Sequence, residues 1–220
     1  MSLRGVRPAG AAAVAALAAA LAFAVSGCAG GQPRPARGHE AGQPASPVQG
    51  PGAGQPAPAG FAWFRPGPAP VGWLRASLAG QRATLSYPGS LRPMHGDPRT
   101  VTVGSTSRSG AVLVYLNVTP RQGAETLRDW PSFRVDHLRA EGQTSVRVDG
   151  VSPLLSFRGG RGRCVIDNYT TRVHDNHYRE IACYVRAAHA ASVLVAATPA
   201  AAWEAAAALL EQVVRSYQAG

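Results

Sequence analysis

The sequence contains no lysine, so all 22 of its basic side chains are arginines. A glycine-rich stretch at 159–162 therefore lacks the Lys of a phosphate-binding loop, and no helical pattern follows it. No Gly-x-Ser-x-Gly segment occurs either, so the sequence signal of a serine-hydrolase elbow is missing. The chain of 220 residues is also too short for two full-sized enzyme domains. These absences speak against an enzyme, and the alternative they leave open is a hydrolase whose site is assembled only in three dimensions.

Acidic residues are few, because 12 Asp and Glu accompany the 22 arginines and the formal net charge is +10. A surface of this sign attracts anionic lipid headgroups or polymers, weakly and in a salt-dependent way. A guanidinium also forms paired hydrogen bonds with phosphate or carboxylate. The composition therefore indicates an anionic component as one kind of partner.

The N-terminus follows the pattern of an export signal. Two arginines precede the run 9–25, which has no polar side chain and is mostly Ala. The next residues, 25–28, read Val-Ser-Gly-Cys and resemble the lipobox of bacterial lipoproteins. In a lipobox the chain is cleaved before the cysteine, and the cysteine sulfur takes a diacylglycerol with fatty acids such as palmitate. We therefore predict a lipoprotein signal peptide at 1–27, cleavage between Gly27 and Cys28, and lipidation of Cys28.

Two acyl chains hold a soluble domain on a membrane where one chain does not. The predicted location is therefore the extracytoplasmic side of the cell membrane, with the membrane itself as a partner through diacylglyceryl-Cys28. An uncleaved membrane anchor is the alternative, since the run 9–25 lies at the lower edge of the length that spans a bilayer.

Residues 28–60 are predicted to form the lipidated N-terminus and a disordered tether. Pro and Gly dominate this stretch and aromatic residues are absent, so it has too little to bury to offset its ordering entropy. The folded domain is predicted at 61–220, because the aromatic residues begin at Phe61.

Short β-type runs bounded by turn residues fill most of this domain. They are expected at 71–78, 82–87, 100–106, 111–118, 144–149, 153–157, 163–173, 178–186 and 192–197. Between 122 and 142, apolar residues recur three or four apart and predict a helix, which Pro131 should delay until about Ser132. Glu125 is expected away from the apolar face of that segment.

A second helix is expected from Thr198-Pro199, as N-cap and first residue, to about Gln218. Its apolar stripe should lie on the sheet and consists of Trp203, Leu210, Val214 and Tyr217. The order of strands, helix, strands, helix with short connections predicts an α+β fold, a mainly antiparallel sheet with two helices packed on it.

With these elements in order, the domain resembles the PsbP-like fold and, within it, the lipid-anchored LpqN-type proteins of actinobacteria. The segments that carry the resemblance are Trp73, Tyr87-Pro88, 116–120, 133–138, 179–182 and Trp203. The resemblance covers 61–220 and implies a compact binding or accessory domain that docks on larger assemblies. It implies no shared catalytic residues, and a common fold does not transfer a function.

Cys164 and Cys183 remain after Cys28 is assigned to the lipid, and disulfides persist in exported proteins. Both cysteines fall on consecutive strands, so the register of the hairpin decides whether they meet. A turn centred on Asp175-Asn176 has favourable turn residues but separates the cysteines by about 13 Å. A turn centred on Val173-His174 pairs Cys164 with Cys183. The compartment favours the bridge and the turn chemistry disfavours it, and we predict the disulfide.

The remaining motifs are interpreted as loops. His174-Asp175-Asn176-His177 offers two imidazoles and a carboxylate, as a metal site would, but Asp-Asn between two strands is ordinary turn chemistry. The stretch 157–163 has three arginines among glycines and is interpreted as a hairpin loop; contact with anions is the alternative. No metal, no cofactor and, for an exported chain, no nucleic-acid partner is expected. Together these features predict a lipid-anchored extracytoplasmic binding or accessory protein of the cell envelope, whose partner is an envelope protein or an anionic envelope component.

Overall fold

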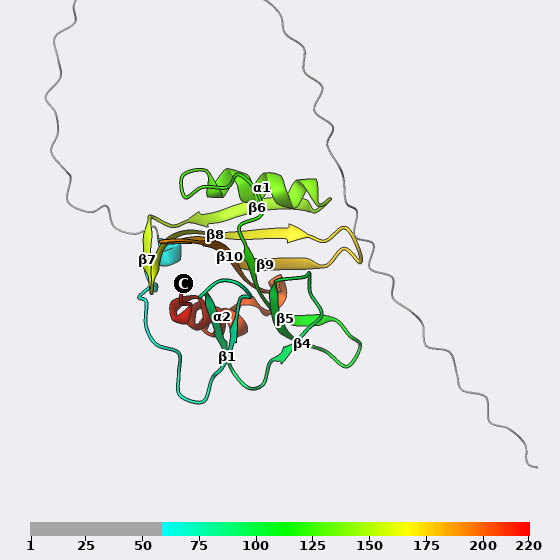
Figure 1. Cartoon of the computed structure of the whole chain (residues 1–220). Coiled ribbons are helices and arrows are strands. Elements are labelled where there is room, and N and C mark those ends of the chain that lie inside the picture. Colours follow the sequence, from blue (N-terminus) through cyan, green and yellow to red (C-terminus); the bar gives the residue numbers. More distant parts are fainter. Residues whose placement is uncertain (1–58) are drawn as a thin grey trace, which may run out of the picture. The chain divides into compact units, whose positions relative to one another are not determined.

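The computed structural model describes residues 59–220 of the chain (Figure 1). The predicted signal peptide, the cleavage site at Gly27 and Cys28, and the predicted tether up to residue 58 lie outside the described residues. None of the helices within 59–220 has the length and apolarity needed to cross a membrane.

The described part contains two α-helices, two short 3-10 helices and ten strands. In chain order the elements are η1 (Ala59–Phe61), β1 (Leu74–Ser77), β2 (Thr84–Tyr87), β3 (Arg92–Pro93), β4 (Val101–Thr106), β5 (Val112–Pro120), α1 (Trp130–Ala140), β6 (Thr144–Val151), β7 (Leu155–Phe157), β8 (Gly160–Thr170), β9 (His177–Ala187), β10 (Ala191–Pro199), η2 (Ala200–Ala202) and α2 (Trp203–Ser216). Each predicted strand region and both predicted helices are present, and the one unpredicted strand is the two-residue β3.

Eight strands form one sheet in the order β3-β4-β5-β10-β9-β8-β6, with β7 paired to β8 beside that path. Every strand pairing is antiparallel, and β1 and β2 form a separate two-stranded sheet. The helices lie on opposite faces of the large sheet, α1 over β6 and β8 and α2 on the other side (Figure 1). The prediction of an α+β fold with a mainly antiparallel sheet and two helices packed on it is confirmed.

The two faces of the sheet bury two separate hydrophobic clusters. Successive residues of a strand point to opposite faces, so Cys164 and Ile166 of β8 face α2, whereas Val165 faces α1. The larger hydrophobic cluster, between the sheet and α2, is called the α2 cluster below. The predicted apolar stripe of α2 is confirmed, because all four of its residues are buried in this cluster: Trp203, Leu210, Val214 and Tyr217. The face toward α1 is smaller and centres on Trp130, whose indole N–H donates to the Ala182 carbonyl at 3.0 Å.

The starts of the two helices differ from the prediction. Helix α1 begins at Trp130, before Pro131, because a proline in the first turn removes only an N–H that has no partner within the helix. Thr198 does not cap α2: it belongs to β10, and its hydroxyl donates to the Leu113 carbonyl at 2.9 Å. A 3-10 turn, η2, follows, and α2 begins at Trp203. Tertiary pairing to β5 therefore replaces the local cap at this threonine.

The glycine-rich stretch after β7 forms a hairpin, as predicted, but its loop is shorter. Phe157 pairs with Gly160, so Arg158 and Gly159 alone make the turn. Gly159 has a φ of 79°, and a Cβ there would lie 2.2 Å from the Ala219 carbonyl oxygen. The residues after Gly159, expected in the loop, instead begin the long strand β8.

Candidate functional site

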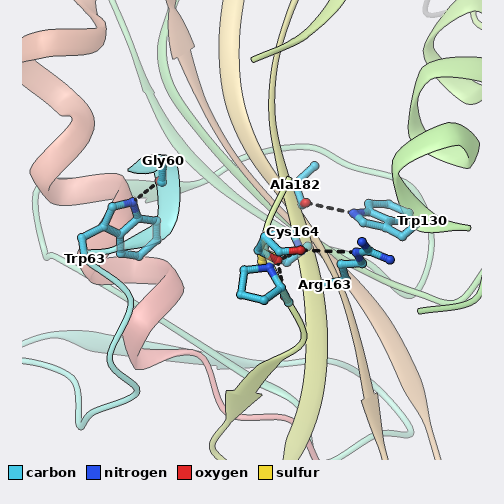
Figure 2. The surroundings of a disulfide bond; sticks show 9 residues. Gly60, Trp63, Trp130, Arg163, Cys164 and Ala182 are labelled. Carbon is cyan, nitrogen blue, oxygen red and sulfur yellow. Dashed lines mark hydrogen bonds between the residues drawn. A yellow bond between two sulfur atoms is a disulfide. The ribbon is translucent and has the colours of Figure 1, made fainter. Parts of the chain in front are cut away.

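The structure joins Cys164 and Cys183 in a disulfide that crosses from β8 to β9 (Figure 2). The two residues are direct partners in the ladder, as are Ile166 and Ile181, and their Cα atoms are 4.0 Å apart. Both cysteines are buried between the sheet and α2. Both the predicted pairing and the register it required are confirmed.

The hairpin turn shows how this register is accommodated. Thr170 pairs with His177, which leaves six residues, 171–176, outside the ladder. Thr171 closes this loop: its hydroxyl donates to the Val173 carbonyl at 2.8 Å and accepts the Asn176 N–H at 3.1 Å. His174 and Asp175 take left-handed φ values of 71° and 49°. A wide turn held by a threonine removes the need for Asp-Asn at its centre.

The histidine cluster therefore lies where a turn was predicted. His177 is the first residue of β9, and its Nδ1 lies 2.9 Å from the Thr170 hydroxyl. Within residues 59–220, His, Cys, Asp and Glu side chains do not gather in threes as a metal site would require. His177 is the one histidine within residues 59–220 whose ring forms a hydrogen bond with a hydroxyl group.

A buried charge cluster, which sequence reasoning missed, lies between α1 and the sheet. It consists of Arg134 on α1, Glu180 on β9 and Asp167 on β8, all nearly inaccessible to solvent. The Arg134 Nε donates to Glu180 Oε1 at 2.9 Å, and Nη2 donates to the same oxygen. The Arg134 Nε is also 3.8 Å from Asp167 Oδ2. Asp167 and Glu180 face each other directly across the β8–β9 ladder.

One guanidinium stands against two carboxyl groups in this cluster, and an arginine stays cationic in proteins. Burial, and then the neighbouring Glu180, raise the pKa of Asp167 to about 9. Burial also raises the pKa of Tyr169 beside them. We therefore assign a proton to Asp167 at neutral pH, because burial and the neighbouring Glu180 disfavour its charged form. The cluster anchors α1 on the sheet and is closed to ligands.

A groove lies beside this anchored helix, at one end of the sheet. Its walls are the connection 121–128 between β5 and α1 and the segment 186–191 around the β9–β10 turn. The Arg121 N–H donates to the Ala191 carbonyl at 2.9 Å and so joins the two walls. The groove has a volume of about 640 Å³. It is large enough for a segment of another molecule.

Basic and apolar side chains line the groove together. Its lining includes three arginines, Tyr184, four alanines and a histidine, namely Arg121, Arg128, Arg186, Tyr184, Ala187, Ala188, His189, Ala190 and Ala191. The three arginines are exposed and form no ion pair with any residue of 59–220. An exposed arginine without a counter-ion binds carboxylate or phosphate groups readily.

The one carboxylate of the groove is occupied by the loop itself. Glu125 is buried, and its two oxygens accept the N–H groups of Gln122 and Gly123, each at 2.8 Å. The expectation of Glu125 within a helical segment, away from its apolar face, is corrected: in the structure Glu125 precedes α1 and is buried, because its carboxylate accepts the N–H groups of its own loop. The groove therefore keeps an excess of positive charge.

No protein-family model and no curated protein matches this sequence. Among solved structures, CyanoP, the PsbP of Synechocystis sp. PCC 6803, is similar at 13% identity over 69% of this chain and 95% of its own, with a TM-score of 0.49. A protein of unknown function from Pseudomonas aeruginosa is similar at 10% identity over 66% and 94%, with a TM-score of 0.44. A protein from Bacteroides thetaiotaomicron VPI-5482 is similar at 11% identity over 63% and 45%, with a TM-score of 0.36. These are similarities of fold, and none of them carries a function to this chain.

Proposed function

We propose that this protein is a lipid-anchored extracytoplasmic binding or accessory protein of the bacterial cell envelope, and that it acts without catalysis. The observation that carries the proposal is that two of the three cysteines form a disulfide, whereas the third stands at the predicted lipidation site. Cys164 and Cys183 form a buried disulfide, and disulfides persist in oxidising compartments outside the cytoplasm. Cys28 is the cysteine outside that bridge, and it occupies the lipobox position.

The basic groove is the docking surface that we propose for this function. Its partner is an anionic envelope component, including the acidic face of an envelope protein, because three arginines that line the groove have no ion-pair partner within residues 59–220. The apolar lining residues, Leu127, Tyr184 and the alanines, would contact a less polar part of the same ligand. Anchoring of α1 by the Arg134 cluster keeps one wall of the groove in place, so the surface is formed before the partner arrives.

We further propose a relationship to the LpqN-type lipoproteins of actinobacteria. The support is the order of sequence motifs along 61–220, from Trp73 to Trp203, together with the lipobox. This relationship would make the domain an adaptor that docks on a larger envelope assembly.

Charge reversal in the groove tests the docking proposal. Arg128→Glu with Arg186→Glu should abolish most cross-linking to envelope components in intact cells, as measured by quantitative mass spectrometry. The matched control is Arg108→Glu with Arg172→Glu, since both arginines are exposed and their guanidinium groups have no hydrogen-bond or ion-pair partner within 59–220. Each double variant changes the net charge by the same amount, so a general electrostatic effect would affect both alike.

The wild type and the control should recover the same cross-linked components, and addition of salt during cross-linking should weaken their recovery. If the groove variant recovers those components as well as the wild type does, the groove is not the docking surface. Far-UV circular dichroism of both variants checks that they remain folded.

A further inference from the structure

A second, smaller pocket is lined by residues of the β1–β2 hairpin, the end of α2 and the β7–β8 turn. Figure 1 shows where these elements lie in the fold. Its volume is about 210 Å³. Two arginines and four hydroxyl side chains are among its lining residues, namely Arg75, Arg158, Ser77, Thr84, Ser86 and Ser216. The lining contains no acidic residue. The pocket is therefore polar and positively charged.

The β1–β2 register explains why these side chains gather. Arg75 pairs with Ser86 and Ser77 pairs with Thr84, so all four lie on one face of the small sheet. The two β2 residues that point to the other face of the small sheet, Leu85 and Tyr87, are buried in the α2 cluster. Packing of the apolar face thus directs the polar face of this hairpin toward the pocket.

The C-terminal segment 218–219 joins the β1–β2 hairpin to the β7–β8 turn beside this pocket. The Thr84 N–H donates to the Gln218 carbonyl at 2.8 Å, and the Ala219 N–H donates to the Arg158 carbonyl at 2.8 Å. These bonds bring Arg158, from the β7–β8 turn, to the same pocket as Arg75, although more than eighty residues separate them in the sequence. The fold, and not the local sequence, places the two guanidinium groups together.

The two arginines of this pocket and three of its four hydroxyl groups are not used by the described part of the chain, whereas the Ser216 hydroxyl donates to the Val213 carbonyl at 3.0 Å. Within residues 59–220, Arg75 and Arg158 form no ion pair and their guanidinium groups make no hydrogen bond. The hydroxyls of Ser77, Thr84 and Ser86 likewise make no hydrogen bond to this part of the chain, although Ser86 is only 4% exposed. Two cations that share a pocket repel each other, and an anion between them removes that cost.

We propose that this pocket binds the phosphate group of a small phosphate ester. Three free hydroxyls and two guanidinium groups supply more donors than the two oxygens of a carboxylate accept, whereas the oxygens of a phosphate ester match them. The volume is several times the roughly 30 Å³ share of one water molecule, which suits a phosphate with a short ester group. Both a phospholipid headgroup and a soluble phosphate ester offer this chemistry. The pocket and the basic groove share no lining residue.

Calorimetric titration of the full chain in nonionic detergent tests this pocket. Glycerol 1-phosphate and inorganic phosphate should bind saturably at one site, and acetate should not. Arg158→Gln and Arg75→Gln should each weaken phosphate binding by roughly tenfold or more, since each removes a charge-assisted hydrogen bond. The matched control Arg108→Gln should leave binding unchanged.

The source of the phosphate is distinguished by competition. If the ligand is a lipid headgroup, micelles that contain phosphatidylglycerol should displace glycerol 1-phosphate from the pocket. Micelles that contain diacylglycerol, which has no phosphate, should not displace it. If neither kind of micelle displaces glycerol 1-phosphate, the ligand is a soluble phosphate ester. If no phosphate probe binds saturably, or if the Arg75→Gln Arg158→Gln double variant binds as the wild type does, the proposal is wrong. The groove variant Arg128→Glu Arg186→Glu should keep its phosphate binding, so the two proposals fail separately.

Discussion

Replacing Asp167 by Asn should make the domain more stable at neutral pH, although it removes a side chain from a buried charged cluster. Asp167 lies inaccessible to solvent against Glu180, and burial followed by that carboxylate raises its pKa from an ordinary 3.8 to about 9. The folded chain therefore holds this proton more tightly than the unfolded chain. Between about pH 4 and pH 9 only the unfolded chain releases it, so this group makes stability fall as pH rises.

The size of the effect follows from proton linkage. One group that is protonated only in the folded state changes the free energy of unfolding by about 1.4 kcal/mol per pH unit. Between pH 5 and pH 7 the free energy of unfolding of the wild type should therefore fall by roughly 3 kcal/mol through this group. The Asp167→Asn variant should not show this fall. The Asn amide is neutral at every pH and can donate to Glu180 Oε2, which has no hydrogen-bond partner within 59–220.

Urea denaturation at a series of pH values measures this difference directly. The free energies of unfolding of wild type and Asp167→Asn should diverge steadily from pH 5 to pH 8, with the variant more stable. The control is Asp136→Asn, an exposed carboxyl group, which should follow the wild type. A variant curve parallel to the wild-type curve would show that Asp167 is ionised in the folded chain and would refute the reasoning.

Two further predictions concern the stability of the domain. Replacing Cys164 and Cys183 together by Ala should lower the free energy of unfolding by roughly 3 kcal/mol, because the bridge closes a loop of about 20 residues in the unfolded chain; an unchanged urea midpoint would contradict this. Deleting residues 29–58 should leave the melting temperature nearly unchanged, since this stretch has no aromatic residue and Val48 is its one branched aliphatic side chain. A large fall on calorimetry would show that the stretch packs on the domain.

Much of the architecture could be predicted because local signals agree with the tertiary fold. The short apolar runs 164–166 and 181–185 indicate the strands β8 and β9, and pairing Cys164 with Cys183 fixes their register. The stripe from Trp203 to Tyr217 likewise identifies the face of α2 that is buried. The stripe has the period of a helix, whereas the continuous apolar runs of β8 and β9 have the length of strands that are buried on both faces.

The charged groups were harder to place because a charged side chain in a sequence is expected in water. Arg134 follows Trp130 by four residues and precedes Leu138 by four, so it lies on the buried face of α1. That spacing is the signal that could have found it, together with two carboxyl groups, Asp167 and Glu180, inside apolar strands. Their mutual contact depends on the register of β8 and β9 and on where α1 lies.

The groove and the small pocket could not be predicted from local sequence. Arg128 belongs to the connection before α1 and Arg186 to the end of β9, and Arg75 and Arg158 come from two separate hairpins. Only the strand order, in which β5 and β9 both flank β10, brings the walls of the groove together. Long-range pairing of this kind has no signature within a short window of sequence.

The most direct test of the proposed function is the mass of the N-terminal peptide of the protein purified from membranes of cells that produce it. The account predicts a peptide that begins at Cys28 and carries a thioether-linked diacylglycerol, and it predicts that Cys28→Ala abolishes both the lipid and processing before residue 28. A wild-type chain that retains residues 1–27, or that begins elsewhere with an unmodified Cys28, would contradict the lipid-anchored function.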